Sequence, residues 1–479
     1  MTAPTPPPER TAARDTAVAR HDHAVTVVDG VGTTEGATWS PRTTALAAEL
    51  AQALGTSRVH HVSTTATGGG VAELLWSSVA HHRSLGLRAD WLVVSAPPEF
   101  FRLTKRVHHG LHGRHTGEFT PDEAAMYRAV TARLARQLSE VVRAGDLVIL
   151  HDPQTVGMAP LLTDSGVRVA WRCHVGSRKD SPAAEATWEL LRPFVQAVPR
   201  SVFSVPDFVP AFLPRSRASV IMPSIEPAAA KNRELSAREC RGRLAGIGLT
   251  ERSGAAAAAF PPAGHVVQDA PLPPDAPLVT QVSRWDPLKD MPGVLRAFAE
   301  HVAPESAAHL LLLGPDPDDI PDDPEGAEVF AEVCRIREGL APRVRSRVHL
   351  AVLTLRDLHA NGLVVNAAQR RSTVVVQKSL EEGFGLTLTE AMWKARPAVA
   401  SAVGGLASQI RDGAEGHLVR PHDHAAFGAR VNELLARSDY ASRLGSAARR
   451  RCRDHFLAER ELGQYLELYL MMVASGETS

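Results

Sequence analysis

Residues 377–397 have the sequence QKSLEEGFGLTLTEAMWKARP, and this stretch decides the fold of the chain. Residues 372–377, which lead into it, are rich in β-branched side chains and predict a short, buried, parallel strand. Residues 388–395 are good helix formers and are closed off by Pro397, which predicts a helix. The segment between them is therefore a turn that leads from a strand into a helix.

The turn contains two glycines and is flanked by two glutamates. Gly383 and Gly385 permit close backbone approach to a ligand, and the amides at a helix N-terminus suit an anion or a row of hydroxyls. Glu382 and Glu390 would lie roughly 12 Å apart along a continuous helix, whereas a chain reversal can bring both carboxylates to one pocket. Alternatively, Glu390 only complements the helix dipole and Glu382 is solvated. These residues alone leave both interpretations open.

The pattern E-G-F-G-L-x-x-x-E at residues 382–390 resembles the paired-glutamate motif of the retaining glycosyltransferases of family 4, which have the GT-B fold. The run PAVASAVGGL at residues 397–406 and the run RDGAEGHLV at residues 411–419 continue the likeness. The resemblance implies an α/β protein with two facing Rossmann-like domains and a C-terminal helix that crosses back to the first domain.

Length and composition are compatible with such a protein. The 479 residues exceed a single hydrophobic core, so two domains are expected, and 44% apolar residues are ample for burial. The 53 basic and 53 acidic residues balance, which argues against a nucleic-acid groove or a basic membrane surface. Four scattered cysteines without CxxC spacing fit a reducing compartment, and no apolar leader or spanning segment is evident. We expect a soluble cytoplasmic protein.

The order of predicted elements indicates two parallel, doubly wound sheets. Strands are predicted at residues 58–63, 91–95, 146–150, 167–172 and 201–204, and then at 278–283, 309–313, 348–352, 373–377, 398–401 and 417–419. The expected domains are a flexible arm (1–40), an acceptor-side Rossmann-like domain (41–250), a linker or insertion (251–277), a donor-side Rossmann-like domain (278–450) and a C-terminal helix packed on the first domain (451–479). The helical character of the tail extends over residues 439–472.

A glycine triplet, residues 68–70, follows the first predicted strand and precedes a predicted helix at residues 71–85. It lacks both the GxGxxG fingerprint and the P-loop pattern, so neither NAD binding nor ATP hydrolysis follows from it. In the context TGGGVAELL it is similar to the loop that trehalose synthases and trehalose phosphorylases place beside the donor phosphate and sugar. By this likeness Gly69 and Gly70 bind the donor.

Polar residues follow two consecutive strands of the first domain, in the runs HDPQ (151–154) and WRCH (171–174). A carboxylate and an imidazole at neighbouring strand ends can hold sugar hydroxyls, although each alone is more often a capping Asp or a structural His. The resemblance implies that His174 lies against the reacting sugar and that Asp152, with Gln154 and Arg172, binds the acceptor. The next residues, VGSRKD (175–180), depart from the Ile-Asp pair usual in the group.

Arg102, Lys105 and His108 lie at helical spacing in the run EFFRLTKRVHHGLHG (99–113). Acceptor binding and a solvated helix face are equally open for these three residues.

In the second domain, the run SRWDPLKD (283–290) follows the first predicted strand. Arg284 offers a planar fork and Lys289 a compact charge, which suits a diphosphate whose charge grows as a glycosidic bond breaks. The alternative is an exposed ion-pair cluster with Asp286 and Asp290. The run matches the donor-diphosphate motif of the family, which favours the functional interpretation.

The resemblance therefore implies a retaining hexosyltransferase that transfers glucose reversibly from a nucleoside-diphosphate-glucose (UDP-, ADP- or GDP-glucose) to glucose, forming trehalose. The implied catalytic residues are His174, Arg284, Lys289 and Glu382, and the implied donor-binding residues include Gly385, Leu386, Thr387 and Glu390. No metal ligands are expected; Mg²⁺ is an optional stimulant, and a homodimer stays open. Alternatives are a trehalose phosphorylase, a family 4 transferase with a specialised acceptor such as an aminocyclitol, and an inactive sugar-nucleotide-binding protein.

Overall fold

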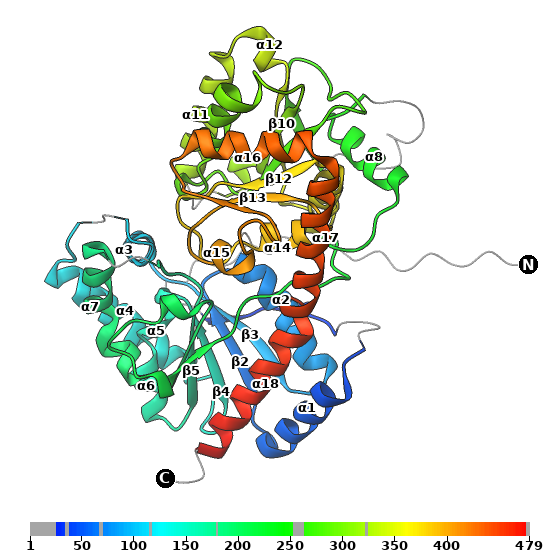
Figure 1. The fold of residues 1–479 in the computed structure, drawn as a ribbon. Helices are drawn as coiled ribbons and strands as arrows, with labels where there is room; N and C mark the ends of the chain where they lie inside the picture. Colours follow the sequence, from blue (N-terminus) through cyan, green and yellow to red (C-terminus); the bar gives the residue numbers. More distant parts are fainter. Residues whose placement is uncertain are drawn as a thin grey trace, which may run out of the picture.

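Two seven-stranded sheets, each covered by helices on both faces, form the cores of two stacked domains (Figure 1). The structure is a computed structural model that describes residues 25–33, 38–66, 70–114, 117–178, 181–251, 263–320 and 324–475. The two domains face each other, and the chain crosses between them twice. This arrangement is the GT-B fold expected from the sequence.

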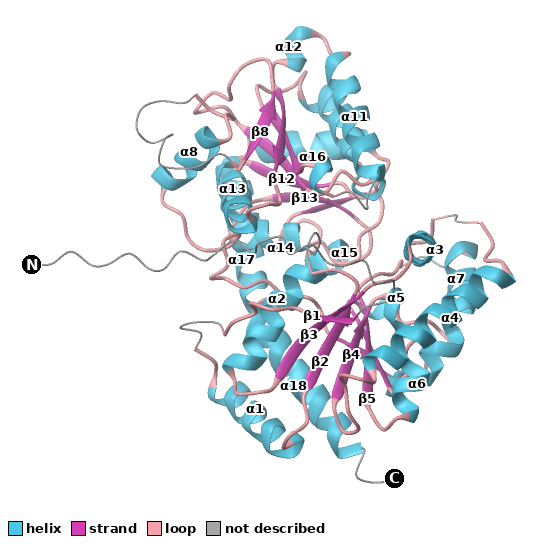
Figure 2. Cartoon of the chain, turned by 180° about the vertical axis from the view of Figure 1, so that it is seen from behind, coloured by secondary structure: helices cyan, strands magenta, loops and turns pink. Residues whose placement is uncertain are grey.

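The first sheet has the strand order β1-β3-β2-β4-β5-β6-β7 and is parallel except for the edge strand β1 (Figure 2). Its strands are β1 (Val25–Val27), β2 (Val59–Ser63), β3 (Ala89–Val94), β4 (Leu147–His151), β5 (Arg168–Cys173), β6 (Arg200–Phe203) and β7 (Ala218–Val220). The order reverses direction between β2 and β4. A crevice opens at such a switch point beyond the carboxyl ends of the strands, and ligands bind there.

The second sheet has the order β14-β13-β12-β9-β10-β11-β8 and is parallel except for the edge strand β8. Its strands are β8 (Gly264–Val267), β9 (Leu278–Val282), β10 (His309–Pro315), β11 (Val348–Leu353), β12 (Val374–Gln377), β13 (Ala398–Ser401) and β14 (His417–Val419). Here the switch point lies between β9 and β12. The eleven strands predicted from the sequence are all confirmed, with small shifts at their ends.

Helices cover both faces of each sheet. In the first domain they are α1 (Pro41–Leu54), α2 (Gly70–Ser84), α3 (Pro98–Leu111), α4 (Pro121–Leu138), α5 (Pro153–Val156), α6 (Ala159–Asp164) and α7 (Pro182–Ala197). The second part of the chain adds α8 (Ala237–Gly246), α10 (Met291–Ala297), α11 (Pro324–Glu338), α12 (Pro342–Arg345), α13 (Leu358–Arg371), α14 (Leu386–Trp393), α15 (Leu406–Gln409), α16 (His424–Ala436), α17 (Ser438–His455) and α18 (Ala458–Ser475). Apolar clusters fill the space between each sheet and its helices.

Two edge strands lie where the sequence predicts an arm and a linker. β1 belongs to the expected arm but pairs with β3, and β8 belongs to the expected linker but pairs with β11. Both are short strands at a sheet edge, and both adjoin stretches rich in Pro, Thr, Ala and Gly, whose composition favours an arm or a linker. The rest of the arm up to residue 24 and the linker residues 252–262 lie outside the described residues.

The C-terminal helix crosses back to the first domain, as expected, but as two helices rather than one. α17 packs on α14 in the second domain, and α18 packs beside α1 on the first sheet (Figure 1). The break falls at Phe456, whose carbonyl accepts a hydrogen bond of 2.9 Å from the Ile225 amide. Ile225 lies on the other interdomain crossing, so the two crossings run side by side and are tied to each other.

Candidate active site

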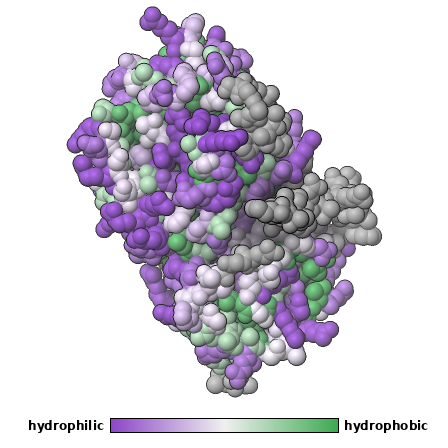
Figure 3. Space-filling view, turned by 90° about the vertical axis from the view of Figure 1, so that its right-hand side faces the viewer, coloured by the Kyte–Doolittle hydropathy of each residue, from purple (hydrophilic) through white to green (hydrophobic). Residues whose placement is uncertain are grey.

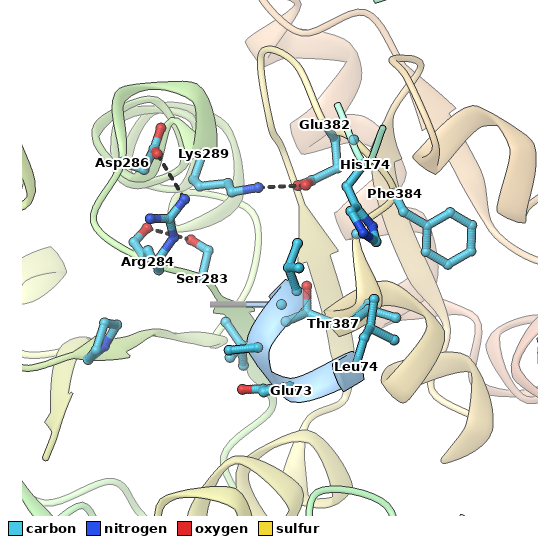
Figure 4. Close-up of a pocket in the computed structure, with 18 of the residues that line it drawn as sticks. Glu73, Leu74, His174, Ser283, Arg284, Asp286, Lys289, Glu382, Phe384 and Thr387 are labelled. Atoms are coloured by element: carbon cyan, nitrogen blue, oxygen red, sulfur yellow. Dashed lines mark hydrogen bonds and ion pairs between the residues drawn. The ribbon is translucent and has the colours of Figure 1, made fainter. Parts of the chain in front are cut away.

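The loops that follow β9 and β12 meet at the switch point of the second sheet and line a cavity of about 330 Å³ between the domains (Figure 4). Residues after β9 supply Ser283, Arg284 and Lys289, while residues after β12 supply Glu382 and the start of α14. The first domain closes the cavity from the opposite side with α2, α3 and the ends of β4 and β5. The cavity therefore lies between two facing sets of strand ends.

An ion pair joins the two loops of the second domain. Lys289 Nζ lies 2.6 Å from Glu382 Oε1, and both side chains are largely buried. The other carboxylate oxygen of Glu382 accepts a hydrogen bond of 3.1 Å from Ser379 Oγ. Lys289 ends a short 3-10 turn, Pro287–Lys289, that Asp286 caps by accepting the Leu288 amide at 2.7 Å. Both charges are thus held in fixed positions at the cavity wall.

Arg284 adds a second cation beside Lys289. Its Nη2 lies 3.4 Å from Asp286 Oδ2, and Figure 4 shows the guanidinium and the Lys289 ammonium on the same side of the cavity. Burial raises the pKa of Asp286, but the nearby Arg284 and Lys289 outweigh this effect, so its pKa is lowered and the carboxylate stays charged. The wall therefore presents two cations and two carboxylates, Asp286 and Glu382.

A buried layer beneath the ion pair fixes the two loops to each other. Gln281 donates from Nε2 to the Lys289 carbonyl at 2.8 Å, and its Oε1 accepts the Lys378 amide at 2.9 Å. The fully buried Lys378 ammonium pairs with Asp290. The sequence analysis missed Gln281 and Lys378, although polar residues within or directly after a buried apolar strand are the signal that marks them.

The start of α14 forms the floor of the cavity. Gly385 has φ of 90° and precedes the helix, which begins at Leu386. Thr387 Oγ1 donates to Gln377 Oε1 at 2.9 Å. Glu390 lines the same cavity as Glu382, and both are less than a tenth exposed. The interpretation in which Glu382 is solvated is therefore wrong.

Glu390 is a buried carboxylate at the cavity wall. Its Oε2 has no hydrogen-bond partner among the described residues, and burial raises its pKa more than Lys231 and Lys394 lower it. Lys231 comes from the interdomain crossing and lies 2.6 Å from Glu73 Oε1 in the first turn of α2. The sequence analysis missed Lys231 and Glu73, because only the fold brings the crossing, α2 and α14 together.

On the first-domain side, Asp152 holds the backbone of His174. Asp152 has the left-handed φ of 63°, a strained conformation for this residue, and its Oδ1 accepts the His174 amide at 2.9 Å. Burial raises the pKa of Asp152 to about 6, against the opposing effects of the His174 amide and Arg172. Figure 4 shows the His174 side chain next to Glu382, so the two domains meet at this point.

Two further histidines of α3, His108 and His112, line the cavity near the cations. His112 Nδ1 bonds the Gly176 carbonyl at 3.1 Å. Burial, and then the charge of Lys289, lower the pKa of His112 to about 4, so this imidazole is neutral at pH 7. The sequence analysis considered acceptor binding for His108, together with Arg102 and Lys105, but assigned no role to His112.

The remaining predicted site residues divide into two groups. Gly70, Gly385, Leu386 and Thr387 line the cavity, and Gly69 lies outside the described residues. Among the residues predicted to bind the acceptor, Asp152 lines the cavity, whereas Arg102, Lys105, Gln154 and Arg172 lie outside its lining. Arg102 is exposed on α3, and Lys105 Nζ lies 3.6 Å from Glu325 Oε2 of α11 in the opposite domain. Arg172 belongs to β5 and is fully buried. Its Nη2 lies 3.4 Å from Ser204 Oγ.

Two features are absent from the part of the chain that the structure describes. No group of three or more His, Cys, Asp or Glu side chains in them is placed to hold a metal ion. No helix in this part of the chain is long and apolar enough to cross a membrane. The face shown in Figure 3 is mainly hydrophilic, with apolar residues interspersed among polar ones.

Comparison with known proteins identifies the family. Residues 61–210 match the family described as "Trehalose synthase, N-terminal domain", and residues 266–451 match "Glycosyl transferases group 1". The chain is 34% identical over 409 residues to a trehalose synthase of Pyrococcus horikoshii, covering 85% of this chain and 88% of that protein. The chain belongs to the trehalose synthase group of GT-B glycosyltransferases.

More distant relatives agree with this assignment. A trehalose phosphorylase of Grifola frondosa is 24% identical over 445 residues, which cover 88% of this chain and 58% of that protein. The solved structure of an α,α-trehalose 6-phosphate synthase from Burkholderia multivorans superposes with a TM-score of 0.64 at 16% identity, over 88% of this chain and 100% of the other. The superposition confirms the GT-B fold, and the trehalose-related glycosyltransferase class rests on the likeness to the trehalose synthase of Pyrococcus horikoshii.

A glycine at the domain junction gives a test of the geometry. A Cβ on Gly383 would lie 2.5 Å from the His174 carbonyl oxygen, so Gly383→Ala must push the two domains apart at the cavity. Because misplacement by about 1 Å costs up to about 10²-fold in rate, we expect kcat/KM to fall at least tenfold while the protein stays folded. Steady-state kinetics and thermal melting check this.

The matched control is Gly463→Ala in α18, where an added Cβ meets no atom within 4 Å. This variant should keep full activity. Unchanged kinetics in Gly383→Ala would contradict the close approach of the two domains at His174.

Proposed function

We propose that the protein transfers glucose from a nucleoside-diphosphate-glucose to glucose, with retention of configuration, and forms trehalose in a reversible reaction. The observation that carries this proposal is the Lys289–Glu382 pair at the switch point of the second sheet, with Arg284 beside it and His174 opposite. Two cations suit a diphosphate, and a carboxylate suits the hydroxyls of a hexose. Their contact places the diphosphate and the sugar it carries side by side.

The donor occupies the second domain. Arg284 and Lys289 bind the diphosphate, and the amides of Gly385, Leu386 and Thr387 at the start of α14 supply further donors for phosphate or sugar oxygens. Glu390, whose Oε2 lacks a partner among the described residues, accepts from the ribose hydroxyls. A hydroxyl pair there would satisfy a buried carboxylate that is otherwise costly.

The acceptor lies between the donor sugar and the first domain. The His174 ring and Asp152 line this part of the cavity and hold sugar hydroxyls. Val175, which departs from the pattern usual in the group, also lines it. This part of the cavity is where selection between glucose and a different acceptor would take place.

Chemistry proceeds on one face of the donor sugar. The acceptor hydroxyl attacks the anomeric carbon from the side on which the diphosphate leaves: the bond from that carbon to the phosphate oxygen breaks, the new glycosidic bond forms, and the acceptor proton passes to a donor phosphate oxygen. Arg284 and Lys289 stabilise the negative charge that develops on the diphosphate. Closure between the two domains excludes water that would hydrolyse the donor.

Arg284→Ala and Lys289→Ala should each lower kcat by about 10² or more, because each removes one charge contact made to the departing diphosphate. Initial rates of nucleoside diphosphate release measure this. Arg296→Ala is a suitable control, since Arg296 of α10 forms an exposed surface pair with Glu332 and is not among the residues that line the cavity. Near-normal turnover in both site variants would overturn the diphosphate assignment.

Incubation of the purified protein with glucose and a panel of UDP-, ADP- and GDP-glucose should give trehalose and the matching nucleoside diphosphate from at least one donor. Chromatography of the sugar product and a coupled diphosphate assay check both products. Phosphate-dependent cleavage of trehalose without any nucleotide would instead indicate a phosphorylase. Donor turnover only with a different acceptor, such as an aminocyclitol, would keep the mechanism and change the substrate.

A further inference from the structure

Three histidines, one half-buried at the cavity and two fully buried behind it, form a hydrogen-bonded row that leads from the cavity into the first domain. His174 Nε2 lies 3.0 Å from His151 Nδ1, and His151 Nε2 lies 3.0 Å from His61 Nδ1. His174 lines the cavity, whereas His151 and His61 lie behind it and are less than 5% exposed. The chain thus links a group at the proposed sugar site to two residues that do not line it.

Sheet geometry explains why the three rings line up. His61 is on β2 and His151 on β4, the strand beside it, and His174 directly follows β5, the next strand. The register pairs His61 with Ile149, two residues before His151, so both side chains point to the same face. The row therefore runs diagonally across the sheet toward the carboxyl ends of the strands, under α2 and α18.

The surroundings of these three histidines keep their imidazoles neutral. Burial lowers the pKa of all three well below the ordinary value, and the neighbouring imidazoles and the buried Arg172 act in the same direction. Other titratable groups close to this face are Asp152, His82, Glu461, Tyr465 and Tyr469. A neutral imidazole has one N–H and one lone pair, so each hydrogen bond fixes the tautomer of the next ring.

Only two placements of the N–H protons on the three imidazoles satisfy both hydrogen bonds. The two placements differ at His61, the end of the row farthest from the cavity. His61 Nε2 has no partner among the described residues; the neighbouring ring, His82, stacks on His61 at 5.4 Å instead of bonding it. In one arrangement this end is a buried N–H without an acceptor, and in the other it is a buried lone pair. Orphaned buried N–H groups are the rarer and costlier of the two, which favours the lone pair.

We propose that His61 and His151 are positioning residues that hold His174 as the neutral Nδ1–H tautomer. In this arrangement His61 Nδ1–H donates to His151 Nε2, and His151 Nδ1–H donates to His174 Nε2. His174 then carries its only N–H on Nδ1 and offers it as a donor to a substrate oxygen. The tautomer of His174 is inferred from the hydrogen bonds among the three histidines alone. That a sugar oxygen accepts this N–H rests on the function proposed above.

Long-range ¹H–¹⁵N correlation spectra of ¹⁵N-histidine-labelled protein test the tautomer directly. The signals of His174 are assigned by their loss in His174→Asn. We expect protonated Nδ1 and bare Nε2 for His174, unchanged between about pH 6 and pH 8. A protonated Nε2, or averaging between the two tautomers, would overturn the inference even if trehalose is formed normally.

Variants at His61 test the consequence for catalysis. His61→Phe removes the donor at the end of the chain, so we expect mixed tautomers at His174 and a fall in kcat of about tenfold, the factor that one ordinary hydrogen bond corresponds to, with little change in the donor KM. His61→Asn retains a short amide donor and should recover most of the rate. Equal kcat in wild type and His61→Phe, with the tautomer unchanged, would contradict the positioning role.

The second domain offers a matched control. His309 Nδ1 and His349 Nε2 lie 2.9 Å apart, and His349 is fully buried; neither residue lines the cavity. His349→Phe breaks a buried imidazole pair of the same kind and should lower the melting temperature without changing kcat. A loss of kcat in His349→Phe equal to that in His61→Phe would show that general destabilisation, not the tautomer of His174, accounts for both. If no nucleotide-sugar is a substrate, the spectra still test the tautomer.

Discussion

The contact between Lys289 and Glu382 is the interaction on which the rest of the site depends. It exists because β9 and β12 are neighbours in space although almost a hundred residues separate them in the chain. The loops that leave these strands in opposite directions open a crevice, and the two charges meet at its edge. Removing two opposite charges from most of their water costs free energy. Their mutual attraction and further hydrogen bonds, here the one from Ser379, offset this cost.

The layers beneath and around this pair serve to keep it in place. Gln281 and the Lys378–Asp290 pair join the two loops from below, where movement of either loop would leave a buried polar group unpaired. The first domain is brought to the opposite side by two interdomain crossings that are bonded to each other at Ile225 and Phe456, and by α18, which packs into the first domain. Its contribution is the backbone held by Asp152 and the imidazole of His174, both placed at ends of adjacent strands.

Much of this could be predicted from the sequence, because most of the predicted site residues are local to strand ends. Arg284, Lys289 and Glu382 each lie shortly after a recognisable strand, Glu390 lies in the helix that follows, and the structure brings all four to one cavity. The edge strands β1 and β8 were missed, since they adjoin stretches rich in Pro, Thr, Ala and Gly whose composition favours an arm and a linker. The break between α17 and α18 was also missed: both segments favour helix, and the break is set by pairing with Ile225, which is distant in the chain.

The acceptor side shows the same limit. Arg102 and Lys105 have the spacing of a helix face, but spacing does not tell which face is turned to the cavity, and Arg102 is exposed. Because side chains alternate along β5, the Arg172 side chain points to the face of the sheet opposite the helices α3 to α7. It is buried there. Lys231 and Glu73 come from a crossing and a helix with no common motif, so only tertiary packing places them beside Glu390. Sequence patterns therefore predicted the cavity-lining residues of the second domain far better than those of the first domain.

The central claim is a division of labour within one ion pair: Lys289 holds the diphosphate and Glu382 holds the sugar. Calorimetric titration of Glu382→Gln with a nucleoside diphosphate, and then with the corresponding nucleoside-diphosphate-glucose, separates the two roles. The account predicts that the diphosphate binds as well as to wild type or better, because Lys289 loses its competing partner, while the glucose-bearing donor binds about tenfold more weakly. Equal weakening of both ligands would contradict it.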